Sequence, residues 1–232
     1  MITENYKIRV LTDVDYALVY APVAWATITA LLLEKKLMAK RYIEIRLQKM
    51  SARRQAFAAA LAWTHHRVLR PEKPAAVSML QVLKAKFAEA QKPVELGVLS
   101  GRTPETHPMT RDLIHSLTDA QNSALFNEDL IFLNLGYTSS EFKIKTIIEL
   151  VRQGLHIIML EDDFKTGWLL ATHPEIPRHM LDVYLLHNLS TLRVLRYRGP
   201  YDNDQLPWNL HILPSYNAIQ EDILQNFLHQ KD

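Results

Sequence analysis

Short apolar runs and longer stretches of helical periodicity alternate along most of this chain. Runs of strand-forming residues occupy five places in the sequence: residues 7–11, 94–99, 129–134, 156–160 and 192–199. Helical patterns follow some of these runs, at residues 110–120, 138–154 and 215–228. Such an alternation predicts an α/β fold, in which a mostly parallel, Rossmann-like sheet carries helices on both faces.

The helical pattern over residues 138–154 has recognisable ends. Thr138 and Glu141 have the spacing of a capping box, in which two side chains accept backbone N–H groups at the start of a helix. Gly154 follows the last periodic position, and glycine is typical there because it adopts positive φ without strain. We therefore expect a helix between these residues.

A long block without glycine separates the first two predicted strands. Residues 23–93 contain three helical stretches rich in Ala, Leu and Lys: 23–50, 51–70 and 75–90. We interpret residues 23–93 as an all-helical insertion, and residues 1–22 together with 94–232 as the core domain.

The insertion is strongly basic. Between residues 34 and 70 the sequence has ten Lys or Arg and two Glu, although the whole chain of 232 residues carries a net charge of only +2. An ordinary solvated helix face would pair opposite charges more evenly. Three kinds of anionic partner fit such a surface: a phosphorylated protein, a nucleic acid and an anionic membrane.

Composition limits the chemistry and the location of the protein. The sequence has no cysteine, which excludes disulfides and thiolate catalysis. It begins without a basic segment leading into an apolar stretch, so we expect no signal peptide. The most apolar run, residues 21–33, is shorter than the roughly 20 residues that a membrane helix needs. We expect a cytoplasmic or otherwise soluble protein.

Polar side chains gather where the predicted strands end. They are Asp13 and Asp15 after the first strand, Ser100 after the second, Lys143 in the helix after the third, and Asp162 and Asp163 after the fourth. In an open parallel sheet, ligands bind at the edge formed by the carboxyl ends of the strands. Desolvating two close carboxylates without a partner is unfavourable, so the first pair indicates a cation or a catalytic site.

The first two of these positions resemble motifs of the haloacid dehalogenase (HAD) superfamily of aspartate-based phosphohydrolases. An apolar strand followed by Asp13-Val14-Asp15 is similar to the first motif of the family. Ser100, which closes an apolar strand, is similar to the second.

The other two motifs follow in the family's order. Lys143 near a helix start is similar to the third motif, with Lys145 as the alternative, and the pair Asp162-Asp163 after an apolar strand is similar to the fourth. The resemblance implies a HAD-like core, in which residues 23–93 take the position of the C1 cap that covers the active site.

The resemblance implies a phosphatase that forms an aspartyl-phosphate. Asp13 would attack phosphorus, and Asp15 would protonate the leaving oxygen and then deprotonate the hydrolytic water. Ser100 would hydrogen-bond a phosphoryl oxygen. Lys143 would offset the charge of the phosphoryl group and orient Asp13.

The resemblance also implies Mg²⁺ as the cofactor. The ion would bind the carboxylate of Asp13, the backbone carbonyl of Asp15 and a carboxylate of Asp162 or Asp163, since hard oxygen ligands suit it. The basic insertion favours a phosphoprotein substrate, including phosphotyrosine, or another macromolecular phosphate.

Two other interpretations stay open. Each of the strand-end aspartates could instead cap the turn or helix that follows it. A catalytically degenerate HAD-fold protein would use the basic insertion to hold nucleic acid or an anionic membrane. Ala17, where the family has Thr or Val, and Thr166, where an acid often follows the fourth motif, favour this second interpretation.

Overall fold

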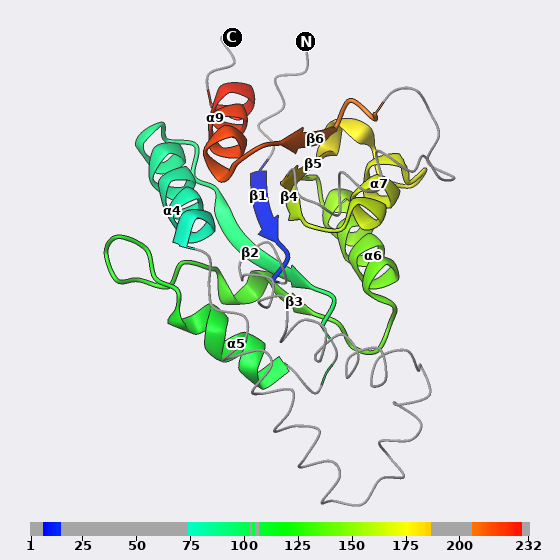
Figure 1. The fold of residues 1–232 in the computed structure, drawn as a ribbon, viewed down its shortest axis with the longest axis horizontal. Coiled ribbons are helices and arrows are strands. Elements are labelled where there is room, and N and C mark those ends of the chain that lie inside the picture. Colours follow the sequence, from blue (N-terminus) through cyan, green and yellow to red (C-terminus); the bar gives the residue numbers. More distant parts are fainter. Residues whose placement is uncertain (1–6, 15–73, 103, 105–106, 187–205, 229–232) are drawn as a thin grey trace, which may run out of the picture.

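A single parallel sheet organises the protein (Figure 1). The computed structural model describes residues 7–14, 74–102, 104, 107–186 and 206–228. Within these ranges six strands follow the spatial order β3-β2-β1-β4-β5-β6. Their bounds are β1 Lys7–Thr12, β2 Glu95–Ser100, β3 Ile131–Leu133, β4 Leu155–Glu161, β5 Leu181–Leu186 and β6 Leu210–Leu213. The predicted α/β fold with a Rossmann-like parallel sheet is confirmed.

Helices cover both faces of this sheet. They are α4 Pro74–Glu89, α5 His107–Ser116, α6 Ser139–Arg152, α7 Phe164–Thr172 and α9 Tyr216–Phe227. Figure 1 shows α4 and α9 on one side of the strands and α6 and α7 on the other. None of the helices in the described ranges is long and apolar enough to cross a membrane.

The strands read as continuous apolar runs because they are buried on both faces. In β4, Ile157 and Met159 belong to the core beneath α6 and α7, whereas Ile158 and Leu160 belong to the core beneath α4 and α9. All four side chains are at most 5% exposed. This period-2 alternation fixes which strand residues face which helices.

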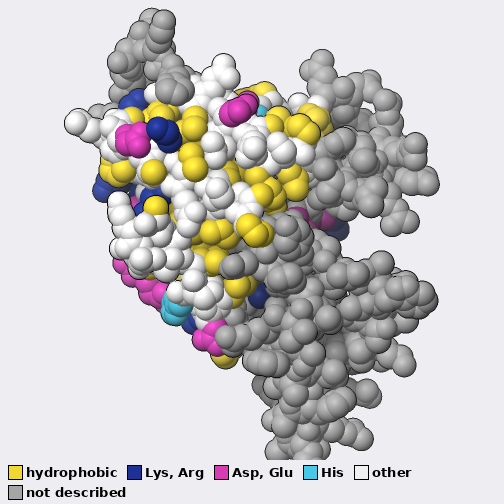
Figure 2. Space-filling view, turned by 60° about the vertical axis from the view of Figure 1, so that its left-hand side comes forward, with side chains coloured by type: hydrophobic (Ala, Val, Ile, Leu, Met, Phe, Trp, Pro, Cys, Tyr) yellow, Lys and Arg dark blue, Asp and Glu magenta, His cyan; other side chains and the backbone are white. Residues whose placement is uncertain are grey.

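Helix α4 packs with the core, although the sequence-based boundary at residue 93 placed it in the insertion. Met79, Leu83 and Phe87 are at most 2% exposed, in the same apolar cluster as side chains of β1, β2 and α9. Partly buried apolar residues flank this cluster, and Figure 2 shows apolar side chains at the surface of this side of the molecule. The predicted helices 23–50 and 51–70 and the predicted strand 192–199 lie outside the described residues.

Strands β5 and β6 and helix α7 were not predicted from the sequence. Strand β5 lies between β4 and β6 and is almost fully buried. It carries Asp182, whose carboxylate accepts hydrogen bonds from His156 of β4 and His211 of β6, each at 2.9 Å. Burial alone would raise the pKa of Asp182, but the two histidines outweigh it and lower that pKa below its ordinary value. The neighbouring strands therefore make a charged residue tolerable in this run.

Candidate functional site

The chain changes direction across the sheet between β1 and β4. It runs outward from β1 through β2 to β3, then returns to β4 on the other side of β1 and continues to β6. Ligands of open α/β sheets bind at such a switch point, outside the carboxyl ends of the strands. Thr12 pairs with Leu160, and the backbone N–H of Asp13 donates to the Leu160 carbonyl at 2.9 Å. The ends of β1 and β4 therefore lie side by side.

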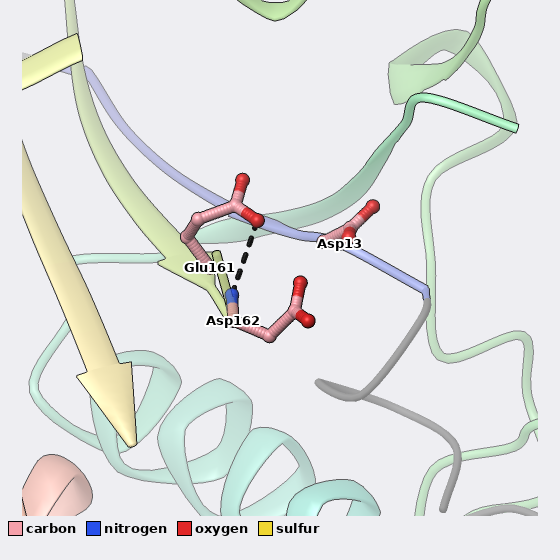
Figure 3. A group of neighbouring side chains, drawn as sticks. All are labelled: Asp13, Glu161 and Asp162. Carbon is pink, nitrogen blue, oxygen red and sulfur yellow. Dashed lines mark hydrogen bonds between the residues drawn. The ribbon is translucent and has the colours of Figure 1, made fainter. Parts of the chain in front are cut away.

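Three carboxylates meet at this point (Figure 3). One oxygen each of Asp13, Glu161 and Asp162 lies within 4.8 Å of the others, and we refer to these residues as the carboxylate cluster. Asp13 is 6% and Glu161 3% exposed. Burial, with the negative charges of Asp13 and Glu161, raises the pKa of Asp162 well above its ordinary value. The cluster is an environment in which one carboxylate disfavours the ionisation of the next.

Lys143 of α6 supplies a positive charge to the carboxylate cluster. Its Nζ lies 2.7 Å from Glu161 Oε2 and 3.2 Å from Asp13 Oδ2, and its side chain is 3% exposed. Burial alone would lower the pKa of Lys143, but the carboxylates of Asp13 and Glu161 raise it above its ordinary value. Lys145, the alternative considered from sequence, is half exposed and pairs with Glu141 at 3.3 Å. The geometry therefore favours Lys143.

Asp162 and Asp163 have different surroundings. Asp163 is the N-cap of α7, and its Oδ2 accepts hydrogen bonds from the backbone N–H of Thr166 at 2.9 Å and from the Thr166 hydroxyl at 2.6 Å. Asp162 instead joins the carboxylate cluster. The capping interpretation thus holds for Asp163, and of the two aspartates considered as metal ligands only Asp162 belongs to the carboxylate cluster.

Thr166 stands four residues after Asp162, at the position where an acid often follows the fourth motif of the HAD superfamily. Besides its bonds to Asp163, its hydroxyl lies 2.8 Å from the hydroxyl of Ser140 in the first turn of α6. The residue therefore links the start of α7 to the start of α6, the helix that carries Lys143.

Ser100 lies at the same edge of the sheet and is fully buried at the end of β2. Its hydroxyl accepts the backbone N–H of Arg102 at 3.3 Å, and it makes no hydrogen bond to the carboxylates of the described residues. Asn134, also buried, accepts the N–H groups of Gly136 and Tyr137 and donates to the Gly101 carbonyl at 3.2 Å. It joins the loop after β3 to the loop after β2.

Two of the residues considered from sequence lie outside the described residues: Asp15 and Ala17. The structure brings Asp13, Lys143 and Asp162 together. No protein-family model matches this chain, and no curated protein matches it.

The donor set suits a divalent cation. When ionised, the three carboxylates of the cluster carry three negative charges, and Lys143 balances one of them. A divalent cation would balance the other two. Carboxylate oxygens are the ligands that Mg²⁺ prefers in proteins. A bound cation would oppose the effects that raise the pKa of Asp162 and would keep this carboxylate ionised. Asp13 and Asp162 are the residues from the sequence prediction that fit such a site.

Glu161 has no role among the predictions made from the sequence. Its alternation with Ile157 and Met159 puts it on the face of β4 that packs against α6, where Lys143 lies. An acid in phase with buried residues at the end of an apolar strand is therefore the signal that could have identified it. No comparable pattern points to Asn134, whose partners are backbone groups of two loops.

At Gly101 the loop after β2 closely approaches Ser139 at the start of α6. A Cβ at this position would lie 1.8 Å from Ser139 Oγ and 2.5 Å from Ser139 Cβ. We expect Gly101→Ala to destabilise the protein by about 1–3 kcal/mol, because such overpacking displaces the start of α6. Urea denaturation measures this change. The double variant Gly101→Ala/Ser139→Gly should recover part of the lost stability, and no recovery would show that the contact with Ser139 is not the cause.

Proposed function

We propose that the protein is a Mg²⁺-dependent phosphatase of the HAD type, which hydrolyses phosphate monoesters through an aspartyl-phosphate on Asp13. One observation carries this proposal: Asp13, at the end of the central strand β1, lies 3.2 Å from the Lys143 amine and within 4.8 Å of two further carboxylates. A buried nucleophilic carboxylate, a fixed cation and oxygen ligands for a metal are what phosphoryl transfer requires.

The chain's own residues divide the chemistry. A carboxylate oxygen of Asp13 forms a bond to phosphorus while the bond from phosphorus to the leaving oxygen breaks. Lys143 offsets the negative charge of the phosphoryl group and holds Asp13 in place. Water then attacks the same phosphorus, which restores the Asp13 carboxylate and releases inorganic phosphate.

Two further residues complete the proposed mechanism. Asp15 protonates the leaving oxygen and then takes a proton from the attacking water, and Ser100 hydrogen-bonds a phosphoryl oxygen. Ser100 ends β2, the strand that lies beside β1, and this position supports its proposed role. Asp15 follows Asp13 by two positions in the sequence.

Mg²⁺ bound by Asp13 and Asp162 would neutralise charge between the nucleophile and the phosphoryl oxygens. The substrate class we propose is a phosphoprotein, including phosphotyrosine, or another macromolecular phosphate. This part of the proposal rests on the ten basic residues between positions 34 and 70.

Hydrolysis of an aryl phosphate, assayed with Mg²⁺ and with EDTA, tests the proposed function. We expect turnover that requires the metal. A rate that EDTA does not change would contradict the proposed site. A folded protein with no turnover would favour the alternative, a degenerate binding protein, and salt-dependent binding to RNA or anionic vesicles would then identify its partner.

A further inference from the structure

We propose that Glu161 is a positioning residue that holds Lys143 against Asp13, and that Asp13 and Asp162, not Glu161, bind the cation. The kinetic part of this inference rests on the proposed phosphatase function, whereas the cation-binding part does not. It assigns different roles to three carboxylates, although all three lie close enough together to bind one ion.

The hydrogen bonds of Glu161 use both of its oxygens. Oε2 accepts from Lys143 Nζ at 2.7 Å, and Oε1 accepts the backbone N–H groups of Asp162 at 3.1 Å and Asp163 at 3.2 Å. The carboxylate is completely buried. A cation bound to Oε2 would lie beside the Lys143 ammonium, and a cation bound to Oε1 would compete with two backbone donors. Both arrangements cost interactions that the fold already makes.

Asp162 has the opposite character. Its backbone N–H is bonded to Glu161, but no residue in the described ranges donates a hydrogen bond to its carboxylate. It is also less buried than Glu161. Glu161 therefore holds the backbone from which Asp162 extends, while the carboxylate of Asp162 remains available to a cation (Figure 3).

Lys143 needs such an anchor. A lysine side chain has several rotatable bonds and carries a point charge, so a single partner fixes its amine poorly. Glu161 is the closer of its two carboxylate partners, at 2.7 Å against 3.2 Å for Asp13. With Glu161 in place, the amine stays beside Asp13 when the Asp13 carboxylate is engaged with phosphorus.

Calorimetric titration with Mg²⁺ separates a positioning residue from a ligand. The double variant Lys143→Met/Glu161→Gln removes a positive and a negative charge together, so the summed charge of the carboxylate cluster and residue 143 is unchanged. We expect it to bind Mg²⁺ within about threefold of the wild type, whereas Asp162→Asn should weaken binding by about tenfold or more, because it replaces a charged carboxylate ligand with a neutral amide. Glu95→Gln is the matched control. It makes the same change in an ion pair with Arg9, at the first residue of β2 and thus at the opposite end of the strands from the carboxylate cluster.

A kinetic cycle gives the second readout. Glu161→Gln should lower kcat for an aryl phosphate by about 10–100-fold. The same change should cost almost nothing further in a Lys143→Met background, because a residue that acts through Lys143 has no effect without it. The lower kcat of Glu161→Gln should persist at saturating Mg²⁺, and this measurement replaces the titration if the double variant does not fold.

Several results would overturn the inference. They are loss of Mg²⁺ binding in the double variant equal to that of Asp162→Asn, additive losses in the kinetic cycle, and recovery of the wild-type kcat in Glu161→Gln at high Mg²⁺. A wild type that binds Mg²⁺ without hydrolysing any phosphate ester would contradict only the proposed function. A wild type that does not bind Mg²⁺ would contradict both.

Discussion

Asp13→Asn is expected to reduce Mg²⁺-dependent hydrolysis of an aryl phosphate by about 10⁴-fold or more, as removal of a covalent nucleophile does in other enzymes. The neutral amide cannot form the acyl phosphate, and it is also a weaker ligand for the cation. Single-turnover and steady-state assays at saturating Mg²⁺ measure the loss.

A thermal unfolding assay complements this kinetic experiment. Mg²⁺ should raise the unfolding temperature of the wild type, because a ligand that binds only the folded state stabilises it, and Asp13→Asn should lose most of this response. Asp119→Asn is the matched control. Asp119 lies in a loop between α5 and β3, and its carboxylate pairs with Lys84 at 2.9 Å. Full activity in Asp13→Asn would show that another residue attacks phosphorus.

Lys143→Met is expected to lower the free energy of unfolding in EDTA by about 3–5 kcal/mol, because it leaves buried carboxylates without their compensating charge. The methionine retains the length of the apolar stem, so the loss reports on the ion pairs with Asp13 and Glu161 and not on a cavity. Urea denaturation measures it. Mg²⁺ should restore part of the lost stability, since the cation balances the same carboxylates.

The activity of Lys143→Met should fall by about 10²–10³-fold, the scale expected when one preorganised charge is lost at a developing anion. Lys145→Met is the control two positions along the same helix. Its amine pairs with Glu141 at 3.3 Å on a half-exposed surface, so we expect less than about 0.5 kcal/mol of change. Equal effects of the two substitutions would refute the special position of Lys143.

The sequence predicted the elements whose patterns are local. The apolar runs of β1, β2, β3 and β4 mark buried strands, and the structure places each of them within two residues of the expected bounds. Helix α6 begins after Thr138 and ends before Gly154, which has φ of +78°. The capping-box bonds do not form as expected, because the Thr138 side chain caps no backbone N–H and its hydroxyl donates to Glu141 at 3.4 Å.

The elements that were missed depend on partners far away in the sequence. Asp182 interrupts the apolar run of β5, and only His156 and His211 on neighbouring strands compensate for it. Gly167 weakens the helical pattern of α7, yet a Cβ there would lie 3.3 Å from a methyl group of Leu185 in β5. Close packing of this helix on the sheet explains the glycine, and it could not be recognised without the sheet.

The sequence by itself determined the α/β class and the order of the polar residues at strand ends, because burial on two faces and the alternation of strands with helices leave a local pattern. It could not choose between Asp162 and Asp163, or assign a task to Glu161. Those outcomes depend on where α6 and α7 lie against β4: one carboxylate caps a helix, one binds an amine, and one stays available. Hydrogen-bond partners between distant segments exist only in the folded chain, so only the tertiary structure distinguishes the three carboxylates.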